Sequence, residues 1–223
     1  MPDALQPLSF DILLNMTAGF TFTENVSSDI YAAPNWGCRA MQLPSEARSG
    51  ARFNYNTLQY HLAGLALAER RGDDVATLLQ NDVLDAMEIQ LDGWIKNSDG
   101  DVFTGSEMRL HPKDMLRFGE VYLNDGRFNG KQIIPKSWIT QSRQPQRSDT
   151  GRAGIDYSYG WWLTKLAGYE AQFAEGYGGQ AIVVVPEVEQ VFVFTAPTGG
   201  LVSGKKHDAR MARLLALTQA LLK

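Results

Sequence analysis

The stretch YGWWLTKLAGYEAQFAEGYGGQAIVVVPEVEQVFVFT, at residues 159–195, decides the fold of this chain. It contains short runs rich in β-branched and aromatic residues, and Ala-Gly, Gly-Gly and Pro-Glu-Val-Glu breaks separate the runs. Runs and breaks of this kind predict an antiparallel meander. The predicted strands are Tyr159–Leu166, Tyr169–Glu175, Ala181–Val185 and Gln190–Thr195.

A helical pattern follows the predicted sheet. Between His207 and Leu222, mostly apolar residues recur at spacings of three and four, namely Met211, Leu214, Leu215, Thr218, Leu221 and Leu222. This spacing places them on one face of a helix. We therefore expect a C-terminal amphipathic helix that packs on the sheet.

The sequence before Pro145 has a mainly helical pattern. Ser9 predicts the N-cap of a first helix, Gly72 ends a strongly periodic one, and Pro112 occupies the first turn of another. The predicted helices are Phe10–Met16, Trp36–Met41, Leu58–Arg71, Asp73–Met87, Pro112–Asn124 and a short one around Trp138.

Together these patterns predict an α+β fold. Residues 1–145 form a mainly helical lobe, and residues 146–223 form an antiparallel sheet with the C-terminal helix. The chain has 223 residues, of which 44% are hydrophobic, and this is enough to bury a sizeable core. The sequence contains no internal repeat, and we expect the two parts to form one integrated domain.

Composition narrows the classes of partner. The formal net charge is -4, and the densest basic stretch is Lys205-Lys206, so the chain lacks a surface for nucleic acid. Cys38 is the single cysteine and has no neighbouring ligand set, so we expect no structural metal. We also expect no cofactor. Apolar runs such as Ile12–Leu14 are too short for a signal peptide or a membrane span, and the compartment stays open.

Familiar catalytic motifs are absent from the sequence. It has no Gly-x-Ser-x-Gly elbow, no phosphate-binding loop and no zinc-binding His-Glu-x-x-His helix. His61, His111 and His207 are the only histidines. The first falls inside a predicted helix and the last begins another, so a Ser-His-Asp triad is not expected.

Three segments nevertheless carry candidate site residues. Tyr55 lies in the polar and aromatic run Phe53–Thr57 just before a predicted helix, where its phenol either enters a cleft or is half-buried and satisfied. Gly176–Gln180 interrupts a strand pattern with glycines, which mark either a structural bulge or the close approach of a ligand. Tyr159–Trp162 either lines a pocket or belongs to the core.

These segments, taken in order, resemble the motifs of the serine β-lactamase-like family. Phe53–Thr57 resembles its second active-site box, Tyr-x-Asn followed by a helix, and Gly176–Gln180 resembles the third box, where Lys-Thr-Gly stands in many members. Supporting segments resemble the family's LLxMTSG, TPRDMARFG and LNxGxxxG motifs and the strand before the third box; they are Leu13–Phe20, His111–Gly119, Leu123–Gly130 and Tyr159–Trp162. The resemblance is greatest to the branch of class C β-lactamases, esterases and 6-aminohexanoate-dimer hydrolases.

The resemblance implies a role for each candidate residue. Tyr55 would be the proton-transfer group, and the backbone N–H of Gln180 would be one donor of the oxyanion hole. Thr57 stands where an amide usually steadies the substrate, and Tyr177 replaces the third-box lysine ahead of Gly178 and Gly179. Trp162 would line the substrate pocket. Without the third-box lysine, recognition of a substrate carboxylate is less favoured, so we expect an ester or a neutral amide as the substrate and not a β-lactam. A further departure from the family is that Ala86 and Glu88 break its Pro-Leu-Gly turn.

The motif that carries the family's nucleophile has no good counterpart in this sequence. Its Ser-x-x-Lys turn lies well upstream of the Leu-Leu-x-Met segment, and in this sequence Leu13 is almost the first residue. The only Ser-x-x-Lys spacing is Ser203–Lys206, in a Gly-rich stretch near the other end. The resemblance therefore implies a chain without its N-terminal strands and nucleophile helix, and inactive on its own.

Two further interpretations remain open. The chain is either a non-catalytic binding or scaffold module derived from the family, or a truncated reading frame whose exposed sheet edge favours self-association. The substrate-binding interpretations share one requirement. Tyr55 and Gln180 must converge on one cavity that accepts a carbonyl group.

Overall fold

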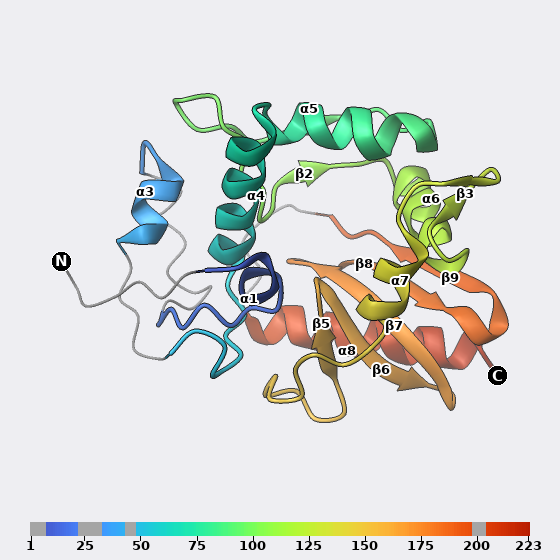
Figure 1. Ribbon diagram of the computed structural model, residues 1–223. Helices are drawn as coiled ribbons and strands as arrows, with labels where there is room; N and C mark the ends of the chain where they lie inside the picture. The colour runs from blue at the N-terminus through green and yellow to red at the C-terminus, as the bar shows by residue number, and fades with distance from the viewer. Residues whose placement is uncertain (1–7, 22–32, 43–47, 198–203) are drawn as a thin grey trace. The chain divides into compact units, whose positions relative to one another are not determined.

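The computed structural model describes residues 8–21, 33–42, 48–197 and 204–223 (Figure 1). The chain divides into two compact units. The first comprises residues 1–110 and 146–152, and the second comprises residues 111–145 and 153–223. The predicted helical lobe at 1–145 differs from this division, because residues 111–145 are grouped with the sheet.

The first unit is helical, as the sequence predicts. Its helices include α1 (Phe10–Leu14), α3 (Trp36–Met41) and α4 (Thr57–Arg71). The predicted caps are confirmed, because the Ser9 hydroxyl accepts from Ile12 N–H at 3.2 Å and Gly72 ends α4 in the left-handed conformation. Helix α1 lies against α4 (Figure 1).

The predicted helix Asp73–Met87 is present but changes pitch along its length. Asp74 caps α5 (Val75–Leu79), which continues as a π-helical turn, η2 (Gln80–Leu84), and a 3-10 turn, η3 (Asp85–Met87). The side chain of Gln80 donates to Ile89 O at 2.8 Å and accepts from Leu91 N–H at 3.1 Å. These bonds tie the irregular helix to the chain that leaves it.

The core of the first unit forms where α1, α3 and α4 meet a later loop. Its buried residues are Leu13, Ala18, Phe20, Trp36, Ala40, Leu58, Leu62, Ala63 and Phe103. A short hairpin of β1 (Gly93–Trp94) and β2 (Met108–Arg109) follows the helices, and the sequence pattern did not predict it. The indole N–H of Trp94 fixes the loop between these strands by donating to Phe103 O and Ser106 O.

The second unit contains the antiparallel sheet that the sequence predicts. Its strand order is β5-β6-β7-β8-β9. The strands are β5 (Asp156–Ser158), β6 (Trp161–Leu166), β7 (Tyr169–Gly176), β8 (Gln180–Val185) and β9 (Gln190–Phe194). The start of the first predicted strand is corrected: Tyr159 and Gly160 have φ of 44° and 93° and form the two-residue turn between β5 and β6.

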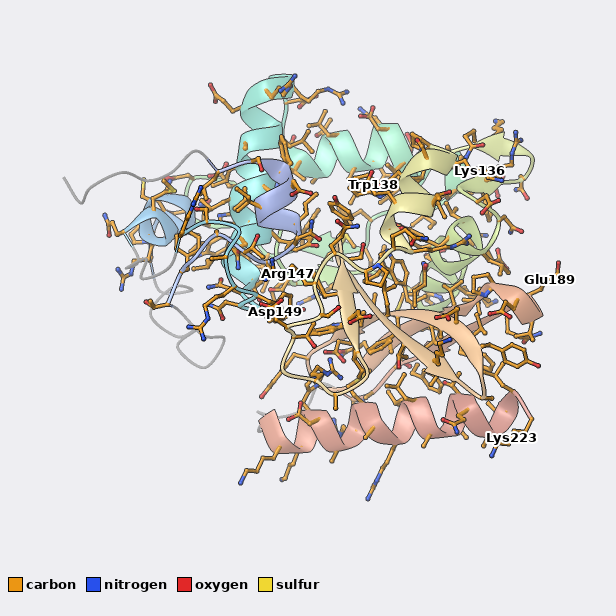
Figure 2. The ribbon with its side chains drawn as sticks, turned by 60° about the horizontal axis from the view of Figure 1, so that its bottom comes forward. Lys136, Trp138, Arg147, Asp149, Glu189 and Lys223 are labelled. Atoms are coloured by element: carbon orange, nitrogen blue, oxygen red, sulfur yellow. The ribbon has the colours of Figure 1, made fainter. Side chains whose placement is uncertain are left out.

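Helices cover both faces of this sheet. One face packs on α6 (Pro112–Leu123) and α7 (Lys136–Ser142) through a cluster of Tyr122, Ile139, Trp161, Leu163, Ile182 and Val184. The C-terminal helix α8 (Gly204–Leu221) runs along the other face (Figure 2). Because both faces of the sheet are covered, side chains on both sides of β8 are buried, and its sequence is a continuous apolar run, Ala181–Val185.

Helix α6 approaches the sheet closely at Gly119. A Cβ atom there would lie 2.5 Å from Val191 Cγ1 and 3.0 Å from Ile182 Cγ2. The helix then ends before a small hairpin of β3 (Arg127–Phe128) and β4 (Lys131–Gln132). The close approach agrees with the grouping of residues 111–145 with the sheet, because α6 packs on β8 and β9.

Candidate active-site segments

Tyr55 immediately precedes a buried helix cap. Its side chain is 37% exposed, whereas the next residue, Asn56, is completely buried and caps α4 by accepting from Leu58 N–H at 2.9 Å. The N–H of Asn56 donates to Met16 Sδ at 3.3 Å. The backbone beside the phenol is therefore fixed while the ring keeps access to solvent.

Gln59 ties the second-box segment to the Leu13–Phe20 motif. Its side-chain oxygen accepts from Ala18 N–H at 2.8 Å, and its amide nitrogen donates to Asn54 O at 2.9 Å. Asn54 N–H also donates to Met16 O at 2.8 Å, and the Tyr60 hydroxyl donates to Leu14 O at 2.9 Å. Two motifs distant in sequence thus form one hydrogen-bonded unit around the turn that carries Tyr55.

An ion pair fixes the chain that leads into this turn. Arg147 and Asp149, labelled in Figure 2, form two bonds, Nε to Oδ1 at 2.8 Å and Nη2 to Oδ2 at 2.7 Å. Asp149 Oδ2 also accepts from Phe53 N–H at 3.1 Å, and Arg147 donates to Gly50 O at 3.1 Å. The Arg147 guanidinium lowers the pKa of the Asp149 carboxyl to about 2.

The third-box segment is the tight turn between β7 and β8. Gly176 pairs with Gln180 in the register of the two strands, so Tyr177, Gly178 and Gly179 form the loop. Gly178 and Gly179 have φ of 99° and 110°, a conformation that residues with a Cβ rarely adopt. With its amide oriented to donate, Gln180 lies 3.2 Å from Gly176 O and 2.8 Å from Tyr177 O, so its side chain folds back over the turn.

Helix α8 contacts this turn through two side chains. His207 Nδ1 accepts from Gly178 N–H at 3.3 Å, and Arg210 Nη1 donates to Gly178 O at 2.6 Å. The rings of Tyr177 and His207 stack with centroids 5.4 Å apart. The sequence analysis assigned no role to either α8 residue. Their spacing of three residues was the available signal, because it places both side chains on the same face of the helix.

The remaining predicted residues have clear positions. Thr57 is the first residue of α4, two residues after Tyr55, and both belong to the first unit. Trp162 belongs to the second unit with Tyr177–Gln180, but it is only 4% exposed. Its ring packs edge-on against Tyr157 with centroids 5.0 Å apart and stacks on Phe173 with centroids 6.4 Å apart. Of the two positions expected for this segment, pocket wall or core, the packing of Trp162 agrees with the core.

His61 is buried in α4. Its ring lies 4.9 Å from Phe103 and 5.8 Å from Trp36 between centroids. Desolvation by burial lowers the pKa of its imidazole to about 4. At neutral pH this histidine is uncharged, and its apolar neighbours mark it as a core residue.

Two kinds of feature are not found among the residues that the structure describes. Within it, no three His, Cys, Asp or Glu side chains gather where they could hold a metal ion. None of its helices combines the length and the apolar character that a bilayer crossing requires.

The motifs and their geometry agree with a comparison against known protein families. The Beta-lactamase family model matches residues 2–217, which is nearly the whole chain. The chain belongs to the β-lactamase family. No curated protein sequence gives a significant match.

Solved structures of β-lactamase-family proteins share the fold. One from Bacillus anthracis, named for 6-aminohexanoate-dimer hydrolase activity, superposes with a TM-score of 0.80 at 19% identity over 96% of this chain. A β-lactamase/D-alanine carboxypeptidase from Yersinia pestis gives a TM-score of 0.72 at 17% identity, over 99% of this chain and 72% of its own. A penicillin-binding protein from Bacillus halodurans gives 0.67 at 17% identity, over 96% and 75%.

The chain spans only part of these relatives. It covers 61% of the Bacillus anthracis structure. At these identities the structural likeness establishes the β-lactamase/transpeptidase-like fold, and the family match establishes membership of the β-lactamase family.

Proposed function

We propose that this chain carries the second- and third-box half of a serine acyl-transfer site that acts on an ester or neutral amide carbonyl. Tyr55 transfers the proton of the nucleophile, and Gln180 N–H polarises the carbonyl. The observation that carries the proposal is that Tyr55, which is 37% exposed, directly precedes the buried cap Asn56. A group that moves a proton must be held within hydrogen-bond reach of it, and the buried cap fixes the backbone that carries Tyr55.

Each proposed role has a physical requirement. An ordinary phenol has a pKa of about 10, so Tyr55 must work beside a cation to act as a base at neutral pH. In the family that cation is the lysine of Ser-x-x-Lys. The Gln180 donor would contribute roughly 3 to 4 kcal/mol to the transition state, which is the usual cost of losing one oxyanion donor.

We further propose that these 223 residues alone do not hydrolyse the substrate. Ser203–Lys206 is the one Ser-x-x-Lys spacing in the sequence, and Ser203 lies outside the described residues. Its neighbours Lys205 and Lys206 are exposed at the start of α8. The reaction would then require a serine and a lysine from another polypeptide segment.

Covalent labelling tests this proposal. The purified chain is incubated with a fluorophosphonate probe and with a fluorescent penicillin, and the adduct is quantified by mass spectrometry. We expect no stoichiometric adduct. Stoichiometric labelling of any serine would overturn the proposal, and a Ser203→Ala variant would show whether that residue is responsible.

Self-association through β9 is also proposed. In the described part of the sheet β9 pairs only with β8, so its other edge offers backbone hydrogen-bonding groups. A groove of about 430 Å³ runs beside it, lined by α6 residues such as Leu116 and by Val191–Thr195. Sedimentation velocity should show a dimer that Gln190→Lys/Thr195→Lys shifts to monomer, and a monomer at all concentrations would contradict the proposal.

A further inference from the structure

Both backbone polar groups of Gly178 are held by side chains from one helix. His207 accepts from its N–H at 3.3 Å and Arg210 donates to its carbonyl at 2.6 Å. The two side chains are three residues apart, so they project from the same face of α8. Neither bond is part of the strand ladder between β7 and β8.

The turn combines an internal bond with this external support. Gly179 N–H donates to Gly176 O at 3.2 Å within the turn. Gly178 and Gly179 are adjacent glycines, the residues with the most backbone freedom, so the bonds from α8 restrict the peptide planes ahead of Gln180 further. Arg210 also lies against the following residue, because a Cβ on Gly179 would be 3.5 Å from Arg210 Cδ.

The bond from Gly178 indicates the tautomer of His207. An imidazole nitrogen that accepts a hydrogen bond carries no proton, so the proton of neutral His207 is on Nε2. That nitrogen lies 3.9 Å from Glu175 Oε1, and Glu175 belongs to β7, the strand that enters the turn. The carboxylate therefore favours the tautomer that accepts from Gly178. The stacked ring of Tyr177 restricts rotation of the imidazole from the side.

We propose that His207 and Arg210 are positioning residues that set the orientation of the two peptide groups on either side of the Gly178 Cα and, through them, of the Gln180 N–H. The importance of this orientation rests on the proposed oxyanion role of Gln180. The hydrogen bonds themselves do not depend on that role. His207 acts as an acceptor with a fixed tautomer, and Arg210 acts as the opposing donor.

Nuclear magnetic resonance of the intact chain tests the tautomer directly. In protein with ¹⁵N-labelled histidine, measured at about pH 9 where imidazoles are neutral, His207 should show a protonated Nε2 and an unprotonated Nδ1. A proton on Nδ1 would overturn the proposal. This measurement needs no variant, so it does not depend on whether a substituted chain folds.

Hydrogen exchange at the Gly178 amide provides the second test. His207→Ala should speed exchange by about tenfold, the effect of losing one hydrogen bond. His207→Asn should keep the Gly178 amide protected, because the asparagine Oδ1 can occupy the place of the imidazole Nδ1 and accept the same hydrogen bond. His207→Gln places its side-chain amide near the position of Nε2, so it should exchange as fast as the alanine variant. Equal exchange in all variants would contradict the role of His207.

The chain offers a matched control. His111 caps α6 by accepting from Lys113 N–H through its own Nδ1, also at 3.3 Å. His111→Ala removes the same kind of bond from the same unit and should leave Gly178 exchange unchanged. If the tautomer and exchange results hold but no carbonyl probe affects Gln180, the positioning is correct and the proposed function is wrong.

Discussion

The side-chain oxygen of Gln59 accepts a hydrogen bond from the Ala18 N–H at 2.8 Å, across 41 residues of sequence. Gln59 is completely buried, and its amide nitrogen donates to Asn54 O. One side chain thus joins the Leu13–Phe20 segment to the turn that carries Tyr55. The two segments resemble separate sequence motifs of the β-lactamase family, and in the folded chain hydrogen bonds join them into one structural unit.

The first prediction concerns this bridge. Gln59→Leu removes the partner of the buried Ala18 N–H and one partner of Asn54 O, and it should lower the free energy of unfolding by about 2–4 kcal/mol. Urea unfolding followed by circular dichroism measures the change. Gln219→Leu, on the exposed side of α8, is the control and should change stability by less than about 0.5 kcal/mol. A Gln59 variant as stable as the control would refute the bridge.

The second prediction concerns His61. Its pKa is lowered from 6.5 to about 4 in the folded chain, so between these pH values the unfolded state binds more protons. Stability is then full above pH 6.5 and falls as the pH drops toward 4, by about 3 kcal/mol at the lower limit. His61→Gln cannot titrate and should flatten the unfolding free energy over this range. An unchanged pH slope in the variant would contradict the buried neutral state.

The third prediction concerns Arg147 and Asp149. Because the carboxyl is nearly half exposed, its pairing should contribute less than about 1 kcal/mol to global stability. Its pKa is lowered, so the contribution is present above pH 3.8 and is lost as the pH falls toward 2. Asp149→Asn should keep the melting temperature nearly constant but speed hydrogen exchange at Phe53 N–H. Unchanged exchange at Phe53 would exclude a role for the pair in fixing the turn.

The fourth prediction concerns the contact of α6 with the sheet. Alanine normally stabilises a helix relative to glycine by about 1 kcal/mol. Gly119→Ala should instead destabilise the chain by about 1–3 kcal/mol, because the new methyl group meets Val191 Cγ1.

A double variant identifies the cause. Val191→Ala removes the contacting methyl groups, so Gly119→Ala should cost less in the Val191→Ala background than in the original chain. Equal costs in both backgrounds would mean that the two residues do not interact.

Much of the fold follows from local patterns in the sequence. The Ser9 cap, the Pro112 start and the Gly72 end are confirmed because each depends only on the backbone geometry of one turn. The strands β6–β9 are confirmed for the same reason, since β-branched runs and glycine breaks act locally. The β-lactamase family itself was predictable because several weak motifs occur in the family's order.

Other features depend on long-range contacts and could not be predicted. The π-helical turn at Gln80–Leu84 follows no recognisable pattern, and its side-chain bonds to Ile89 and Leu91 appear only in the folded chain. The bonds from His207 and Arg210 to Gly178 join segments about 30 residues apart. Trp162 could be assigned to either a pocket or the core until its packing against Tyr157 was known.

The proposed function requires that Tyr55 and Gln180 serve one carbonyl group. Titration with the unreactive amide N-phenylbutyramide, followed by resonances of the Tyr55 ring and the Gln180 amide, tests this requirement. We expect both signals to shift with the same dissociation constant and Tyr55→Phe to weaken the response at Gln180. Shifts at only one residue, or two different dissociation constants, would contradict it.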